Sequence, residues 1–178
     1  MNLNLKNETN SWGIVARLFH WSIAFLILGL LYVGLIMVDM VNSPEKFELY
    51  GYHKSLGVII LALIILRLIW RWINTTPTVP TPGLASRLSA PVLYILMLMM
   101  PVSGIIMSQG GGHPISLFGW FTLPTLIEKN PSLGKLAWQI HGYTGKILIG
   151  MICLHFIAAL YHQWILKNNL LRRMIKGH

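Results

Sequence analysis

One stretch near the C-terminal end decides how this chain is organised: residues 138–162, with the sequence WQIHGYTGKILIGMICLHFIAALYH. It is apolar enough to form a helix inside a membrane, and it contains His141 and His155, fourteen residues apart. At about 100° per residue this spacing is almost four turns, so both imidazoles lie on nearly the same helical face, about 21 Å apart along the axis. One helix therefore presents two imidazoles at two depths, and a single metal ion cannot bind both.

The composition indicates an integral membrane protein. Of the 178 residues, 54% are hydrophobic and 11% are charged, whereas a soluble domain carries roughly 25% charged residues. The single cysteine, Cys153, excludes a disulfide within the chain, and the lack of a Cys-x-x-Cys-His motif excludes covalent c-type haem. The net charge of +9 comes from basic residues at the ends of apolar runs. This distribution is typical of topology signals, and it argues against nucleic-acid binding.

Four apolar runs are long enough to cross the roughly 30 Å hydrocarbon core of a bilayer. We therefore predict an all-α fold, a four-helix membrane bundle formed by one transmembrane domain over residues 1–178. The first run is expected to be a retained helix, because it is too long for a signal-peptide core and no small-residue cleavage site follows it. The predicted spans are about 14–38, 53–72, 88–107 and 136–166.

The connectors and the charges predict the topology. Residues 74–83 hold three prolines and four threonines, and residues 109–134 hold three consecutive glycines and three prolines, so both segments are expected to be loops. Four spans place both termini on one side of the membrane. If that side is the inside, nine lysines and arginines lie there, including every arginine, against five outside. The positive-inside rule then favours cytoplasmic termini.

Four of the seven histidines form two pairs by depth. His53 begins the second span and His141 lies near the start of the fourth, so both are expected near the outer surface. His20 and His155 lie about 12 to 14 Å from the inner interface, counted from the nearest tryptophans. A histidine inside a bilayer is costly and usually faces the bundle interior with a partner. The pattern predicts two haems b with bis-histidine ligation, one bound by each pair.

Other interpretations of these histidines must be weighed. A lone histidine in a membrane helix more often packs in the bundle and makes a hydrogen bond than binds a metal. Four histidines at two matching depths are harder to explain that way. Zinc fits poorly, because two nitrogen ligands per level are too few and no Cys, Asp or Glu lies at those depths. A haem-free scaffold or transporter is the remaining interpretation from another class.

Basic residues near the two levels are candidate partners for haem propionates. Arg67 and Arg71 lie towards the inner level, and Lys54 and Lys146 lie towards the outer level. Snorkelling to the interface explains Arg71 and Lys54 equally well, but it explains Lys146 less well.

His162 is a candidate quinone ligand. It lies one heptad past His155, on almost the same face, at the inner interface. It could hydrogen-bond a quinone carbonyl, with Trp164, Trp12 and Ser22 as neighbours. A histidine that simply faces water is the alternative.

Several short motifs in this order resemble those of the bacterial cytochrome b561 family. They are RLFHW at 17–21, YHKSLG at 52–57, the Arg67 and Arg71 pair, PVSG at 101–104, the spacing from His141 to His155, and His162. Each motif alone is weak, but their order and spacing are fairly specific and cover nearly the whole chain.

The resemblance implies a multi-pass protein of the bacterial inner membrane with two haems b. It assigns His20 and His155 to the inner haem, His53 and His141 to the outer haem, and His162 to a quinone site. The likeness is greatest to members that oxidise superoxide at the periplasmic face and reduce ubiquinone near the cytoplasmic face, which implies a superoxide:ubiquinone oxidoreductase.

The identity of the electron donor is the most open part of this interpretation. Four outer lysines would attract an anion such as superoxide, namely Lys46, Lys54, Lys129 and Lys135, although nearby acids partly cancel their charge. Another periplasmic electron donor is possible. The alternative function is a haem-bearing membrane anchor, which links a partner dehydrogenase or hydrogenase to the quinone pool.

Overall fold

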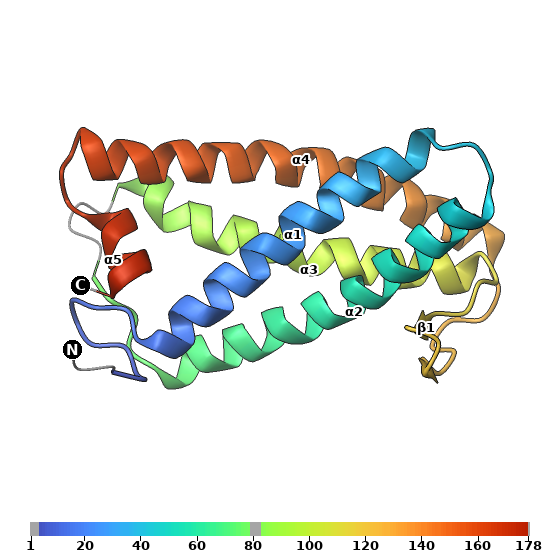
Figure 1. Ribbon diagram of the computed structural model, residues 1–178, viewed down its shortest axis with the longest axis horizontal. Helices are drawn as coiled ribbons and strands as arrows, with labels where there is room; N and C mark the ends of the chain where they lie inside the picture. Colours follow the sequence, from blue (N-terminus) through green and yellow to red (C-terminus); the bar gives the residue numbers. More distant parts are fainter. Residues whose placement is uncertain (1–3, 79–82, 178) are drawn as a thin grey trace.

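The computed structural model describes residues 4–78 and 83–177, and within them four long helices form an elongated bundle (Figure 1). They are α1 (Ile14–Asp39), α2 (Pro44–Ile73), α3 (Leu84–Gly110) and α4 (Pro131–Trp164). A short helix, α5 (Leu170–Lys176), follows α4. In the loop between α3 and α4, β1 (Ser116–Leu117) pairs antiparallel with β2 (Phe121–Thr122).

The four long helices are suited to cross a membrane. They contain 26 to 34 residues and are apolar along their central parts. Large apolar side chains are exposed on every one of them, for example Phe25 (68%), Leu66 (50%), Ile95 (57%) and Phe156 (60%). Such a surface is unfavourable in water but is expected where lipid is the solvent. The predicted all-α membrane bundle is thus confirmed.

The helices extend beyond the predicted spans, most clearly at the start of α2 and α4. α2 begins at Pro44 because Ser43 caps it, its Oγ accepting from the backbone N of Lys46 at 3.3 Å. α4 begins at Pro131 because the side chain of Asn130 accepts from the backbone N of Leu133 at 3.1 Å. A cap followed by proline at the first helical position starts each helix in polar sequence, before the hydropathy rises. Apolar runs therefore marked only the lipid-embedded part of each helix.

Lys46 has a structural role in the turn between α1 and α2. It is 8% exposed, and its Nζ donates to the carbonyl oxygen of Met40 at 2.6 Å. A cation at this position satisfies a terminal carbonyl of α1 and complements the negative end of the helix dipole. Lys46 is consequently not an exposed charge that could attract an anionic donor, as the sequence had suggested.

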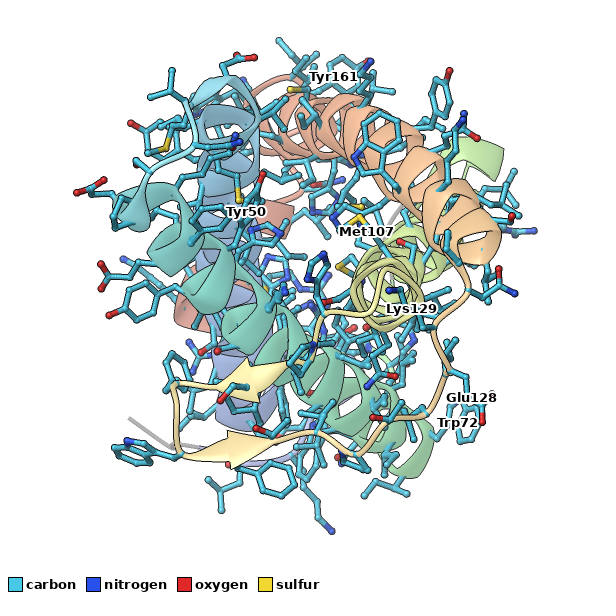
Figure 2. All side chains as sticks on the ribbon, turned by 90° about the vertical axis from the view of Figure 1, so that its right-hand side faces the viewer. Tyr50, Trp72, Met107, Glu128, Lys129 and Tyr161 are labelled. Atoms are coloured by element: carbon cyan, nitrogen blue, oxygen red, sulfur yellow. The ribbon has the colours of Figure 1, made fainter. Side chains whose placement is uncertain are left out.

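The helices do not pack evenly around the bundle axis. Close backbone packing runs from α1 to α2, from α2 to α3 and from α3 to α4, but α4 makes no extensive contact of this kind with α1 or α2. Viewed along the bundle, the helices surround a central space filled by their side chains (Figure 2). The buried centre of that space is apolar and is formed by Ile23, Ile27, Ile60, Ile64, Leu96 and Leu148.

One end of the bundle is closed by three segments, and we call it the terminal end. The first described residues, residues 74–78 after α2, and α5 all lie there, opposite the β-hairpin (Figure 1). Asn7 Nδ2 donates to the carbonyl of Thr75 at 2.8 Å, and the backbone N of Trp12 donates to the carbonyl of Gly177 at 3.1 Å. These contacts tie the N-terminal segment to both of its neighbours.

The loop at the other end, the hairpin end, is held by two buried polar side chains. Gln109 donates to the carbonyl of Pro124 at 2.9 Å and accepts from the backbone N of Leu126 at 3.0 Å. Ser55 on α2 donates to the carbonyl of Ser116 and accepts from the backbone N of Phe118, both at 3.1 Å. The long loop is therefore attached to α2 and α3 rather than free.

The buried centre predicts a clear difference between two neighbouring isoleucines. Ile64 is 0% exposed whereas Ile65 is 45% exposed, so Ile64→Ala should leave a cavity and destabilise the bundle by about 2 kcal/mol or more. Ile65→Ala, its matched control, removes only lipid contacts and should cost much less. Thermal unfolding of both variants in one detergent tests this, and equal losses would contradict the assigned core.

Candidate functional site

The four histidines predicted as ligands come together in two pairs between the helices; His155 is exposed, and the other three are half-buried. The ring centroids of His53 on α2 and His141 on α4 lie 6.2 Å apart, with the ring planes at 76°. Those of His20 on α1 and His155 on α4 lie 6.3 Å apart, with the planes at 55°. We call these the outer and inner pairs. α4 contributes one histidine to each, and the helical rise over the fourteen positions from His141 to His155 separates the pairs by about 21 Å.

The spacing within each pair fits one metal ion between two imidazoles. Two metal–nitrogen bonds of about 2 Å, plus about 1 Å from each nitrogen to its ring centre, give about 6 Å between the centroids. Among the residues that the structure describes, no group of three or more His, Cys, Asp or Glu side chains could hold a metal ion. A metal bound here would need further ligands from its own cofactor, and the four nitrogens of a porphyrin supply them.

Hydrogen bonds from α3 fix the orientation of His141. Its Nδ1 lies 2.9 Å from the carbonyl oxygen of Met100 and 3.1 Å from Ser103 Oγ, and Ser103 Oγ itself donates to the same carbonyl at 2.9 Å. Because a carbonyl only accepts, the proton of a neutral His141 belongs on Nδ1. Its Nε2 then keeps a free lone pair, which is the state that a metal ligand requires.

The outer pair borders two cavities with room for a bound group. One, of about 50 Å³, is lined by both histidines and by Gly57 on α2. The other, of about 180 Å³, lies between α1 and α2 and is lined by His53 and Gly29. A Cβ added at Gly57 or Gly29 would meet nothing within 4 Å. His53 Nδ1 is buried and has no hydrogen-bond partner among the described residues, which is a costly state that bound groups often relieve.

Two further glycines allow neighbouring helices to approach the outer histidines. A Cβ at Gly34 on α1 would lie 3.4 Å from His53 Cε1, and a Cβ at Gly104 on α3 would lie 3.3 Å from His141 Cε1. Larger side chains at these positions would displace the imidazoles. The glycines thus contribute to the geometry of the pair by leaving space for its rings.

The inner pair has a cationic and aromatic environment. Arg67 Nη2 lies 3.2 Å from His20 Nδ1, and its guanidinium lies over the Tyr94 ring, 5.6 Å from the centroid. The Trp21 ring meets His20 edge-on at 5.2 Å, and Trp21 Nε1 donates to the carbonyl of Met174 on α5 at 3.3 Å. Arg67 therefore lies at the depth predicted for it, and α5 covers the neighbouring side.

The remaining candidate propionate partners differ in position. Lys54 is half-buried and Arg71 is exposed. Lys146 is exposed, with its Nζ 5.8 Å from the centroid of the exposed Tyr143 ring. Five residues along a helix rotate the side-chain direction by about 140°, so Lys146 projects from a different face of α4 than His141. Its position gives no support to a contact at the outer pair.

The three predicted quinone residues differ in exposure and in the direction they project. His162 is half-buried, and its Nδ1 lies 2.7 Å from Asn168 Nδ2 in the turn towards α5. Trp164 is 65% exposed and, two residues further on, projects from nearly the opposite side of α4. Ser22 is exposed on α1. Of the three, only His162 is positioned by a polar contact.

Sequence reasoning did not identify Ser103, Trp21 and Trp70 as parts of the site. Ser103 is 5% exposed inside an apolar span, and a buried hydroxyl needs a partner, which could have drawn attention to it. The indole Nε1 of Trp70 is buried and unpartnered among the described residues, one turn from Arg67 on α2. Tryptophans near a membrane interface are so common that neither Trp21 nor Trp70 gave a signal.

Comparisons with known proteins show which family the chain resembles. Residues 11–177 match the family described as prokaryotic cytochrome b561. The chain is 28% identical to cytochrome b561 homolog 2 of Escherichia coli (strain K12), over 97% of this chain and 95% of that protein. It is 30% identical to the probable superoxide oxidase CybB of Yersinia pestis and 28% identical to cytochrome b562 of Cereibacter sphaeroides, in both cases over 88% of this chain and 90% of the relative.

The close approach of α3 to His141 can be tested with a pair of glycine variants. Gly104→Leu should push the imidazole aside and reduce the haem bound per purified chain by about half, as read from the b-type absorption. Gly51→Leu is the control, because Gly51 is exposed and its added Cβ would meet nothing within 4 Å. Full haem content in Gly104→Leu, or equal loss in both variants, would contradict this geometry.

Proposed function

The chain belongs to the prokaryotic cytochrome b561 family, and we propose that it is a diheme member that carries electrons across the inner membrane. The family implies a b-type haem and a multi-pass inner-membrane electron carrier. We propose two haems because two pairs of imidazoles lie at two levels of α4, and the rings of each pair are spaced to hold one metal ion. We assign the outer haem to His53 and His141, and the inner haem to His20 and His155.

Bound haem supplies reversible one-electron chemistry, and the chain's own residues supply position and electrostatics. Met100 and Ser103 hold His141 with its Nε2 towards the outer site. Arg67 places a positive charge beside the inner pair, where it can also bind a propionate. Arg71 at the inner level and Lys54 at the outer level are the further propionate partners in this proposal.

The apolar cluster between the pairs separates the two levels. Leu148 lies midway between His141 and His155 on α4 and is 2% exposed. Ile60 and Ile64 close the same region from α2. A centre of this kind excludes water and disfavours ions, so protons and small anions are kept out while electrons pass.

For the reaction, we propose superoxide as donor at the hairpin end and ubiquinone as acceptor at the terminal end. Two superoxide ions each lose one electron and become oxygen, and one ubiquinone gains two electrons and two protons and becomes ubiquinol. The support is the 30% identity to a probable superoxide oxidase. The charge count favours a periplasmic hairpin end, where Lys54, Lys129 and Lys135 would attract the anion.

At the acceptor end, His162 is the proposed hydrogen-bond donor to the quinone. Asn168 holds its Nδ1 at 2.7 Å, which leaves Nε2 to donate to a quinone carbonyl. Trp164 and Ser22 remain proposed neighbours only through movement on quinone binding, because both are exposed and Trp164 projects away from His162.

Ligand variants test the haem assignment. His53→Ala should leave about one haem per chain, because only the outer pair loses an iron ligand, and His20→Ala should do the same for the inner pair. Absorption and redox titration of the purified variants should show the two remaining haems to be different. Loss of both haems in either variant would show that folding depends on the histidine and would leave the assignment unsupported.

The donor is tested by supplying superoxide and a ubiquinone analogue to the purified protein alone. We expect quinone reduction far above the spontaneous rate, with a sharp loss in His53→Ala. If the wild-type protein reduces quinone no faster than buffer but is reduced by a co-purified dehydrogenase, the protein is a haem-bearing anchor and the superoxide proposal is wrong.

A further inference from the structure

Two arginines lie at the terminal end, where α5 contacts α1. Arg17 on α1 donates from Nη1 to the carbonyl of Ile175 at 2.7 Å, and Arg173 on α5 donates from Nη1 to the carbonyl of Thr78 at 3.2 Å. Gly177 joins them: its backbone N donates to the carbonyl of Arg173 at 2.9 Å, and a Cβ built on it would lie 3.4 Å from Arg17 Cζ. Both side chains are half-buried.

These guanidinium groups retain donors with nothing to bind. Arg17 Nε, Arg173 Nε and Arg173 Nη2 are buried from solvent and have no hydrogen-bond partner within the described ranges. Leaving a charged donor desolvated and unpaired is among the costliest states in a folded protein. Three such donors in these two side chains point to an acceptor beyond the described residues.

An anion suits these positively charged donors, because among the described residues only one acidic side chain, Glu8, lies at this end. Four of the five acidic residues lie in or beside the turns of the hairpin end. The fifth, Glu8, is bonded to Asn4 and, at 3.3 Å, to Ser11. The fork of an arginine matches the oxygens of a phosphate, and two arginines can share one phosphate group.

The surroundings indicate that the anion belongs to a lipid. Exposed apolar side chains flank the arginines, including Leu18 (62%) next to Arg17 and Ile175 (53%) on α5. Just before α5, Trp164 and Ile165 are 65% and 67% exposed. A ligand that fills this position therefore needs a phosphate beside acyl chains at the membrane boundary. A headgroup ammonium would find no free carboxylate here, which favours an anionic headgroup over a zwitterionic one.

We propose that Arg17 and Arg173 form a binding site for the phosphate of an anionic phospholipid, which holds α5 against the end of α1. The lipid adds a third contact to the two that Arg17 and Trp21 already make with α5. Trp21 donates to the carbonyl of Met174, next to Arg173, and also packs on His20, so it links this end of α5 to the inner pair.

The test uses the full-length, haem-loaded protein, stripped of lipid in detergent and titrated with phosphatidylglycerol or phosphatidylcholine under native mass spectrometry. We expect one phosphatidylglycerol to bind at least about tenfold more tightly than phosphatidylcholine. Arg173→Gln should remove that preference. Arg172→Gln is the matched control, because it removes the same charge from the neighbouring, exposed position. It should change the affinity for phosphatidylglycerol less than about twofold.

Four outcomes would overturn the proposal. If Arg172→Gln and Arg173→Gln lose the preference for phosphatidylglycerol equally, the lipid binds only to a diffuse basic surface. Competition by millimolar inorganic phosphate would show a site for a soluble anion, and equal binding of the two lipids would show no selection for an anionic headgroup. Loss of haem from Arg17→Gln or Arg173→Gln would show that the arginines bind haem carboxylates. If Arg173→Gln does not fold, Arg173→Lys should still lose part of the preference, because it keeps the charge without the fork.

Discussion

A polar ring nitrogen inside an apolar bundle must find a partner, and this constraint connects all four long helices. His141 and His155 project from one face of α4 towards the side of the bundle where α4 makes no extensive backbone contact. Their partners there are imidazoles from α2 and α1. α3 has no histidine, yet its Met100 carbonyl and Ser103 hydroxyl hold the outer ring. Each helix therefore has a defined role at one of the two levels.

The parts of this arrangement that follow from periodicity could be predicted from the sequence. Fourteen residues between His141 and His155 determine the face and the spacing, and counting depth from each helix end was sufficient to find His53 and His20. The spans followed from hydropathy. Helix ends did not, because Ser43 and Asn130 start helices in polar segments that a hydropathy profile treats as loop.

Features that depend on contacts between distant segments could not be predicted in this way. Lys46 has an ordinary sequence context for an exposed loop, but the turn buries it against the end of α1. The prediction that Lys146 binds a propionate used only its depth in the membrane, whereas its angular position on α4 decides which groups it can contact. The contacts of α5 with Trp21 and Arg17 join residues more than 150 positions apart. Neither spacing nor composition encodes such a contact.

The two pairs also differ in the charge that surrounds them, and the difference suits the proposed direction of electron flow. At the outer pair, the His141 Nδ1 proton is shared with a carbonyl and a hydroxyl, which makes the imidazole a stronger electron donor and favours the oxidised state of a bound metal. At the inner pair, Arg67 places a positive charge 3.2 Å from His20 Nδ1, in a low-dielectric region where charge acts strongly and favours the reduced state. With haem ligated as proposed, the protein's own groups therefore make the inner site the better electron acceptor. Under the proposed function, this difference would draw an electron from the hairpin end towards the terminal end, where the quinone is proposed to bind.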